Sequence, residues 1–169
     1  MKNHNFSLGF TLLELIVVVA ILATMAAALL AVLDPFSQIQ KSKDARVKSD
    51  LSQIQKGLEV YYQDNQSYPT SNLSYQIVDK SGTVRDWGLP WTPYMNILPK
   101  DATTANKYIY YSSNGQTYYI YASLNRGSKD SQACTGGQCA APSGSGINML
   151  NACGGKCNFG VSSPDVSIQ

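Results

Sequence analysis

The order of apolar and polar residues divides the chain at about residue 34. Between Phe10 and Leu33 the sequence is apolar apart from two threonines, and its one charged residue is Glu14. A run of about 20 apolar residues is long enough to cross a bilayer as an α-helix. A short polar segment that ends in Gly9 precedes this run. The pattern therefore predicts a membrane-spanning helix over residues 10–34.

A second helix is predicted after a break at Asp34-Pro35, because proline removes a helical hydrogen bond and disfavours helix at the residue before it. Apolar residues then recur at spacings of four and three, which is typical of one face of an amphipathic helix. They are Val47, Leu51, Ile54, Leu58 and Tyr61. We expect this stripe, within residues 35–66, to pack on a globular domain, and the helix to end near Asp64-Asn65.

The stretch from Gln38 to Arg46 is mostly polar and is expected to stand exposed as a neck. Basic and acidic residues alternate along this part of the helix: Lys41, Lys43, Arg46 and Lys48 with Asp44 and Asp50. Mixed charges of this kind favour a solvated helix face over a nucleic-acid site.

Residues 67–126 are predicted to hold a loop and a small antiparallel sheet. Proline and glycine argue against long regular elements up to about Lys107. Two tyrosine-rich runs, residues 108–113 and 116–121, then flank Asn114-Gly115. This dipeptide predicts a hairpin with a two-residue turn, because both residues tolerate positive φ. The tyrosines could form a stacking platform for bases or sugars, but a half-exposed sheet face explains them more simply.

Glu14 is the residue with the strongest functional signal. A carboxylate inside a membrane span costs about 3 kcal/mol on insertion scales, so it marks a candidate site. A secretory signal peptide is one alternative, but its apolar region is about 7–15 residues long and carries no acid. A plain membrane anchor is the other, with Glu14 reaching the headgroups beside the positive helix end.

The string Gly9-Phe10-Thr11-Leu12-Leu13-Glu14-Leu15 resembles the prepilin cleavage and methylation motif of type IV pilins and type II secretion pseudopilins. The resemblance implies that a prepilin peptidase removes residues 1–9 by cutting between Gly9 and Phe10, and then methylates the new N-terminus of Phe10. Glu14 would be fifth in the mature chain. In the family this glutamate is thought to pair with the N-terminal amine of a neighbouring subunit, which would set the register of assembly.

The same resemblance implies an α+β, pilin-like fold, in which a long N-terminal helix packs on a small antiparallel sheet. The implied function is that of a structural subunit, a homo-oligomer in the helical filament of a type IV pilus or type II secretion pseudopilus. A minor pilin that binds DNA or a surface ligand at the filament tip is the alternative. The implied partners are the prepilin peptidase, an inner-membrane platform protein and an assembly ATPase. The subunit would cross the inner membrane once before assembly and then join a periplasmic or cell-surface filament.

Composition adds little that is specific. The net charge of +2 implies neither a nucleic acid nor an acidic substrate. The single histidine, His4, lies in the predicted leader, so the mature chain would have no histidine for a catalytic triad or for a metal. We therefore expect no enzymatic activity and no cofactor.

Residues 127–169 are rich in Gly, Ser, Asn and Pro and contain all four cysteines: Cys134, Cys139, Cys153 and Cys157. Their spacings do not fit a zinc site, which ordinarily pairs C-x2-C motifs. The extracytoplasmic location that the resemblance implies favours two disulfides instead. Four cysteines allow three pairings, and both local bridges and cross-links between the two pairs are possible. The segment is expected to form a stapled surface loop.

Calcium is a further possibility that the resemblance raises. Major type II secretion pseudopilins usually bind calcium in a loop after the hairpin. Asp130, Ser131 and Asp165 could supply oxygen ligands here, but their spacing matches no calcium-binding pattern. We therefore expect no metal.

Overall fold

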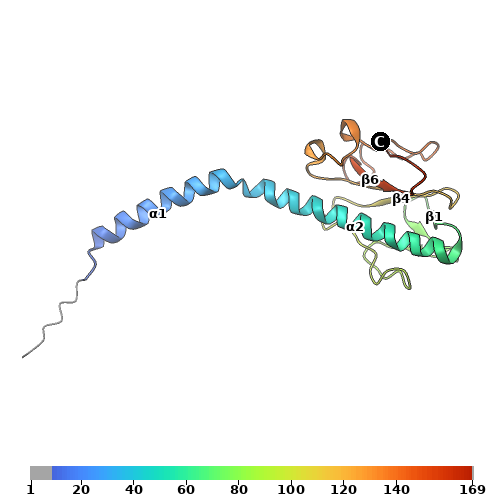
Figure 1. The fold of residues 1–169 in the computed structure, drawn as a ribbon, viewed down its shortest axis with the longest axis horizontal. Coiled ribbons are helices and arrows are strands. Elements are labelled where there is room, and N and C mark those ends of the chain that lie inside the picture. Colours follow the sequence, from blue (N-terminus) through green and yellow to red (C-terminus); the bar gives the residue numbers. More distant parts are fainter. Residues whose placement is uncertain (1–8, 169) are drawn as a thin grey trace, which may run out of the picture. The chain divides into compact units, whose positions relative to one another are not determined.

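The computed structural model describes residues 9–168, with the backbone alone at residues 31–33. Residues 1–8 of the predicted leader, including His4, lie outside the described residues. The chain forms two compact units, residues 1–39 and residues 40–169 (Figure 1).

The first unit contains α1 (Leu12–Leu33) and the beginning of α2 (Pro35–Asn65). Asp34 separates the two helices and adopts a left-handed conformation with φ 38°. Its carboxylate accepts a hydrogen bond from the backbone N–H of Ser37 at 3.3 Å, so Asp34 caps α2, and Pro35 occupies the first helical position, which needs no N–H. The predicted break is confirmed.

Within α1, the stretch Leu12–Leu30 has a mean hydropathy of 2.6 and is long and apolar enough to cross a membrane. Its large apolar side chains are exposed all around the helix, which is therefore not one with a single core-facing stripe.

The second unit is built on the C-terminal part of α2. All five residues of the predicted apolar stripe are buried, and the helix ends at Asn65 as expected. Two short antiparallel sheets accompany the helix. One has the order β1-β2-β3 and contains β1 (Thr70–Ser71), β2 (Ile77–Val78) and β3 (Val84–Arg85). The other has the order β4-β5-β6 and contains β4 (Ile109–Tyr111), β5 (Tyr119–Ala122) and β6 (Phe159–Ser162).

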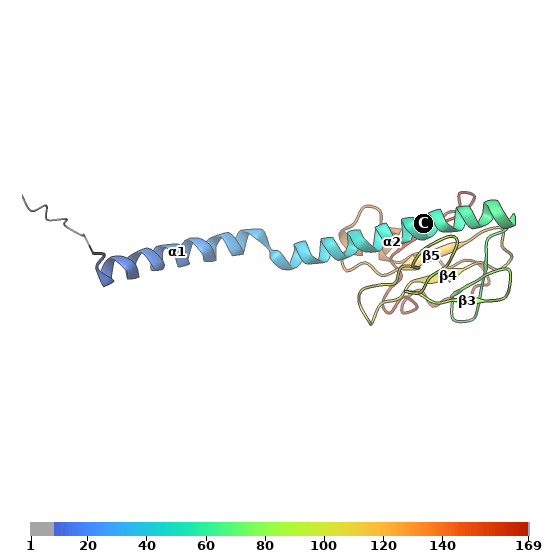
Figure 2. The same cartoon turned by 90° about the horizontal axis from the view of Figure 1, so that it is seen from below.

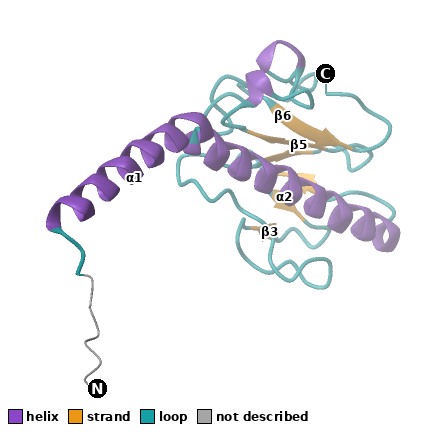
Figure 3. Cartoon of the chain, turned by 60° about the vertical axis from the view of Figure 1, so that its left-hand side comes forward, coloured by secondary structure: helices purple, strands orange, loops and turns teal. Residues whose placement is uncertain are grey.

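The β4-β5-β6 sheet has a core on each face, because successive side chains of a strand point to opposite sides. Tyr110 and Ile120 belong to the core shared with α2, whereas Ile109 and Tyr121 belong to a second core formed with the C-terminal segment. Figure 2 shows β4 and β5 beside α2, and Figure 3 shows β6 next to β5, with the C-terminal loops on the side away from α2. The second unit therefore has three layers: helix, sheet and C-terminal segment.

The predicted two-residue turn at Asn114-Gly115 is wrong. Tyr111 pairs with Tyr119, so residues 112–118 form the connection between β4 and β5. The carbonyl of Gly115 accepts a hydrogen bond from the N–H of Tyr68 at 2.7 Å. This contact with a distant part of the chain replaces the ladder hydrogen bonds that a tight hairpin would make.

The interpretation of residues 41–50 as a wholly solvated helix face is also wrong. Asp44 is 4% exposed and accepts hydrogen bonds from the backbone N–H groups of Asn125 and Arg126, at 2.7 and 2.9 Å. Asp50 is buried too and accepts a hydrogen bond from the Tyr108 hydroxyl at 2.7 Å. These acids attach α2 to the domain, while the basic side chains at positions 41, 43 and 46 are exposed.

Candidate functional site

The N-terminus of α1 holds the residues of the predicted processing motif. Thr11 is the residue that caps α1, and Glu14 is the third residue of the helix. One carboxylate oxygen of Glu14 accepts hydrogen bonds from the Thr11 N–H at 3.0 Å and from the Thr11 hydroxyl at 2.8 Å. The same hydroxyl accepts a bond from the Glu14 N–H at 3.3 Å. This reciprocal arrangement is a capping box, which satisfies backbone donors that a helix start otherwise leaves unpaired.

The sequence interpretation missed the role of Thr11 in capping α1, although its spacing to Glu14 is the known Thr-x-x-Glu signature of a capping box. Thr11 fixes the position of the Glu14 carboxylate through these hydrogen bonds. The carboxylate of Glu14 is fixed beside residue 11, one residue away from the amide nitrogen of Phe10. If the chain is cut between Gly9 and Phe10, that nitrogen becomes a free amine.

Gly9 and Phe10 are open to the surroundings. Phe10 is 83% exposed, and a Cβ built on Gly9 would meet no atom within 4 Å. Neither packing nor a positive φ within the described chain requires glycine at this position. A larger residue would fit at this position in the described chain.

The four cysteines form two local disulfides, Cys134–Cys139 and Cys153–Cys157. This confirms the prediction of two bridges and answers the question of pairing that the sequence left open. All four sulfur-bearing side chains belong to the second core, together with Ile147 and Met149. The C-terminal segment is therefore more than a stapled surface loop, because it forms a core and contributes β6 to the sheet.

Reduction should loosen this segment selectively. Each bridge closes a loop of only four or five residues, for which the chain-entropy model gives a stabilisation of about 2 kcal/mol. Hydrogen exchange after treatment with dithiothreitol should show lost protection in residues 130–158 and retained protection in α2. Equal protection before and after reduction would contradict a stabilising role. The rate of trypsin cleavage after Lys129, which is exposed, is an independent measurement, and it should increase on reduction.

Asp130, one of the candidate calcium ligands, forms an ion pair with Lys48 in this structure. The carboxylate of Asp130 accepts two hydrogen bonds from the Lys48 ammonium, at 2.6 and 2.8 Å, and this ammonium holds the pKa of Asp130 below its ordinary value. A carboxylate paired with a cation is a poor calcium ligand. Across residues 9–168, no group of three or more His, Cys, Asp or Glu side chains could hold a metal ion.

The structure thus defines a class of protein: an apolar helix able to cross a membrane, with a capped glutamate at its start, followed by an α+β domain stabilised by disulfides. Comparison with known sequences agrees. The family model "Type II secretion system (T2SS), protein G" matches residues 35–140, and "Prokaryotic N-terminal methylation motif" matches residues 5–30. The chain belongs to the type II secretion system protein G family. This confirms the resemblance to pseudopilins that residues 9–15 suggested.

Several curated relatives are type II secretion system core protein G. The protein of Klebsiella pneumoniae is 33% identical over 95 residues, which cover 55% of this chain and 66% of the relative. The protein of Escherichia coli K12 is 30% identical over 60% of this chain and 70% of the relative. The protein of Vibrio cholerae is 31% identical over 66% of this chain and 75% of the relative. The match thus spans slightly less than two thirds of the first of these relatives. No solved structure matches the chain.

Proposed function

We propose that the chain is a structural subunit that polymerises through its N-terminal helix into an extracytoplasmic filament of a type II secretion system. The observation that supports this most is the capped Glu14 at the start of an otherwise apolar membrane helix, directly after Gly9-Phe10. A membrane anchor alone needs no carboxylate there, and the carboxylate costs free energy in lipid.

In this proposal the prepilin peptidase cuts between Gly9 and Phe10 and methylates Phe10. The new α-amine has a reference pKa of about 8 and is mostly protonated at neutral pH. Glu14 of one subunit then pairs with the amine of a neighbour, and this pair fixes the register of the incoming subunit. The apolar surface of α1 serves in both environments, because it faces lipid before assembly and neighbouring helices afterwards.

The proposal includes a set of partners that act in sequence. The prepilin peptidase processes the subunit in the inner membrane, where it is anchored by a single helix. A platform protein and an assembly ATPase then extract it into a homo-oligomeric periplasmic or cell-surface filament. The function is structural, and no catalytic activity is proposed.

Intact mass and N-terminal analysis of the subunit from sheared filaments and from the envelope fraction of native cells, the latter also after chemical cross-linking, tests the proposal. We expect chains that begin with N-methylated Phe10 and that weigh four hydrogens less than the fully reduced form, because both disulfides are closed. A native N-terminus at Met1, or one after the alanines at positions 26–28, would contradict the proposal. Processed chains found only in the envelope fraction agree with a periplasmic filament, whereas processed chains that never cross-link to one another there would contradict polymerisation.

A further inference from the structure

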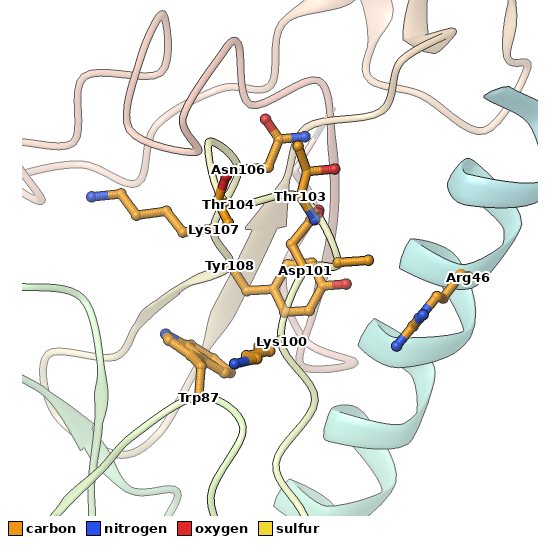
Figure 4. Close-up of a pocket in the computed structure, with 10 residues that line it drawn as sticks. Arg46, Trp87, Lys100, Asp101, Thr103, Thr104, Asn106, Lys107 and Tyr108 are labelled. Atoms are coloured by element: carbon orange, nitrogen blue, oxygen red, sulfur yellow. Dashed lines mark hydrogen bonds between the residues drawn. The ribbon is translucent and has the colours of Figure 1, made fainter.

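A cavity of about 440 Å³ lies in the second unit, between α2 and the segment that leads into β4. Arg46 of α2 lies on one side and Trp87 on another, and residues 100–108 form the rest of the wall (Figure 4). A neighbouring cavity of about 260 Å³ shares Arg46, Asp101 and Tyr108 with it and adds Lys43. The volume is in the range of small-molecule sites, which is about 300–1,000 Å³.

The charges that line the cavity are mostly positive and unpaired. Within residues 9–168, the side chains of Arg46, Lys100 and Lys107 make no ion pair and no hydrogen bond. The one carboxylate in the lining, Asp101, accepts a hydrogen bond from the Thr103 N–H at 2.7 Å and so shapes the local turn. Three cations against one acid favour an anionic ligand.

The stem of one of these cations is positioned by the fold. The Lys100 stem lies against Gly88, where a Cβ would come within 2.8 Å of the Lys100 Cδ. Arg46 lies on α2, so its backbone is fixed while its side chain is exposed. Cationic groups that are already positioned lose less conformational freedom when they bind a ligand.

The cavity also has an aromatic wall. Trp87 is half-buried and meets Tyr108 edge to face, with ring centroids 5.9 Å apart. The Tyr108 hydroxyl is engaged by Asp50, so the cavity is lined by the tyrosine ring and not by a free phenol. Aromatic faces of this kind bind apolar surface and C–H groups of a ligand.

A third feature is a set of free polar side chains at the rim. Thr103, Thr104 and Asn106 line the cavity, and their side chains make no hydrogen bond within the described chain. Hydroxyl and amide groups both donate and accept, which suits a ligand with several hydroxyl groups.

We propose that this cavity binds an acidic sugar, a hexuronate unit of an anionic polysaccharide. Its carboxylate would lie near Arg46 and Lys100, the apolar face of its ring against Trp87, and its hydroxyls at the rim formed by Thr103 and Asn106. An acidic peptide could also use the cations, so it is compared directly in the test below. Single-stranded nucleic acid needs a groove with successive stacking platforms, whereas this cavity contains one tryptophan.

The test is a titration of the full chain, in detergent, with a linear trimer of galacturonate. We expect saturable binding by calorimetry, together with a change in tryptophan fluorescence. Arg46→Gln should weaken binding about tenfold, because glutamine can still donate a hydrogen bond but lacks the charge that strengthens a bond to a carboxylate. Lys80→Gln removes a positive charge from an exposed position outside the cavity and should leave the affinity unchanged.

Two further ligands decide the chemical class. A neutral glucose trimer and a glutamate trimer should each bind at least tenfold more weakly than the galacturonate trimer. Equal binding of the neutral sugar would overturn the role of the cations, and equal binding of the peptide would overturn the assignment to a sugar. No saturable galacturonate binding, or an Arg46→Gln variant with unchanged affinity, would overturn the proposal as a whole. The unassembled subunit is used, so the result is independent of filament formation.

Discussion

Cells that express only Glu14→Ala subunits should contain no filaments, although the peptidase should still remove the leader. The substitution leaves the amine of each incoming subunit without its partner, and breaking a buried ion pair by removing one member costs about 3–5 kcal/mol. Such a loss weakens each addition step by at least a hundredfold. Filament yield by electron microscopy, and processing by N-terminal analysis of the membrane fraction, measure the two effects separately.

Glu14→Gln separates the two roles that the structure gives to this side chain. A glutamine can still accept the hydrogen bonds from Thr11 and complete the capping box, but it carries no charge. If the ion pair sets the register, this variant should also fail to assemble. Normal assembly of Glu14→Gln would show that the helix cap is sufficient and that pairing with the amine is not needed.

Thr24→Ala is the matched control within the same helix. The Thr24 hydroxyl donates to the carbonyl of Ile21 at 2.8 Å, so its polar group is already satisfied inside α1. This variant should assemble as the natural sequence does. A loss of filaments here would mean that any change of polarity in α1 prevents assembly, and the Glu14 result would then say nothing about register.

The helices could be predicted from the sequence because their signals are local. The apolar run, the Asp34-Pro35 break and the stripe from Val47 to Tyr61 each depend on residues a few positions apart, and the structure has all three. The processing motif is also contiguous, so Glu14 could be singled out without a structure. The capping partner Thr11 had an equally local signature and could have been identified in the same way.

The predictions that were wrong, and the features that were missed, concern parts of the structure that depend on contacts between residues far apart in the sequence. The connection between β4 and β5 is docked on Tyr68, more than forty positions away, which no propensity of Asn114-Gly115 reveals. Strand β6 pairs with β5 across the whole cysteine-containing segment, and its short sequence, with a glycine, carries a weak strand signal. Asp44 looks like a surface acid until the backbone of residues 125–126 is placed against it.

The second unit should unfold steeply above pH 10, because its core contains several buried tyrosines. Burial raises the pKa of Tyr108, Tyr110, Tyr118 and Tyr121 above the ordinary value, and a carboxylate hydrogen-bonded to the hydroxyl raises the pKa of Tyr108 further. In the unfolded chain tyrosine ionises near pH 10. Above this pH the folded state binds more protons than the unfolded state, so stability falls as pH rises.

The size of the effect follows from the number of groups. Each tyrosine that stays protonated in the fold while it ionises in the unfolded chain removes up to about 1.4 kcal/mol per pH unit. The four together should remove about 4 kcal/mol between pH 10 and pH 11, which is a large part of the 5–15 kcal/mol typical of a domain. Burial also raises the pKa of Tyr61 and Tyr68, which add to this loss. Stability should be fully retained below pH 10. Urea unfolding of the full chain in detergent, followed by near-ultraviolet circular dichroism from pH 8 to pH 11.5, measures this slope.

Tyr121→Phe is the variant that identifies the cause. The Tyr121 hydroxyl donates to the carbonyl of Ala140, an exposed residue whose carbonyl can bind water instead, so the loss at pH 8 should be only about 1 kcal/mol. Between pH 10 and pH 11 the loss of stability should be smaller by about 1 kcal/mol, because one titrating group is gone. Tyr75→Phe is the control for changing a tyrosine outside this set, because the Tyr75 hydroxyl makes no hydrogen bond in the described chain.

Recovery of the circular dichroism signal on return to pH 8 distinguishes ionisation from chemical damage to the disulfides. An identical slope in the natural chain and in Tyr121→Phe would mean that the buried tyrosines do not cause the alkaline transition.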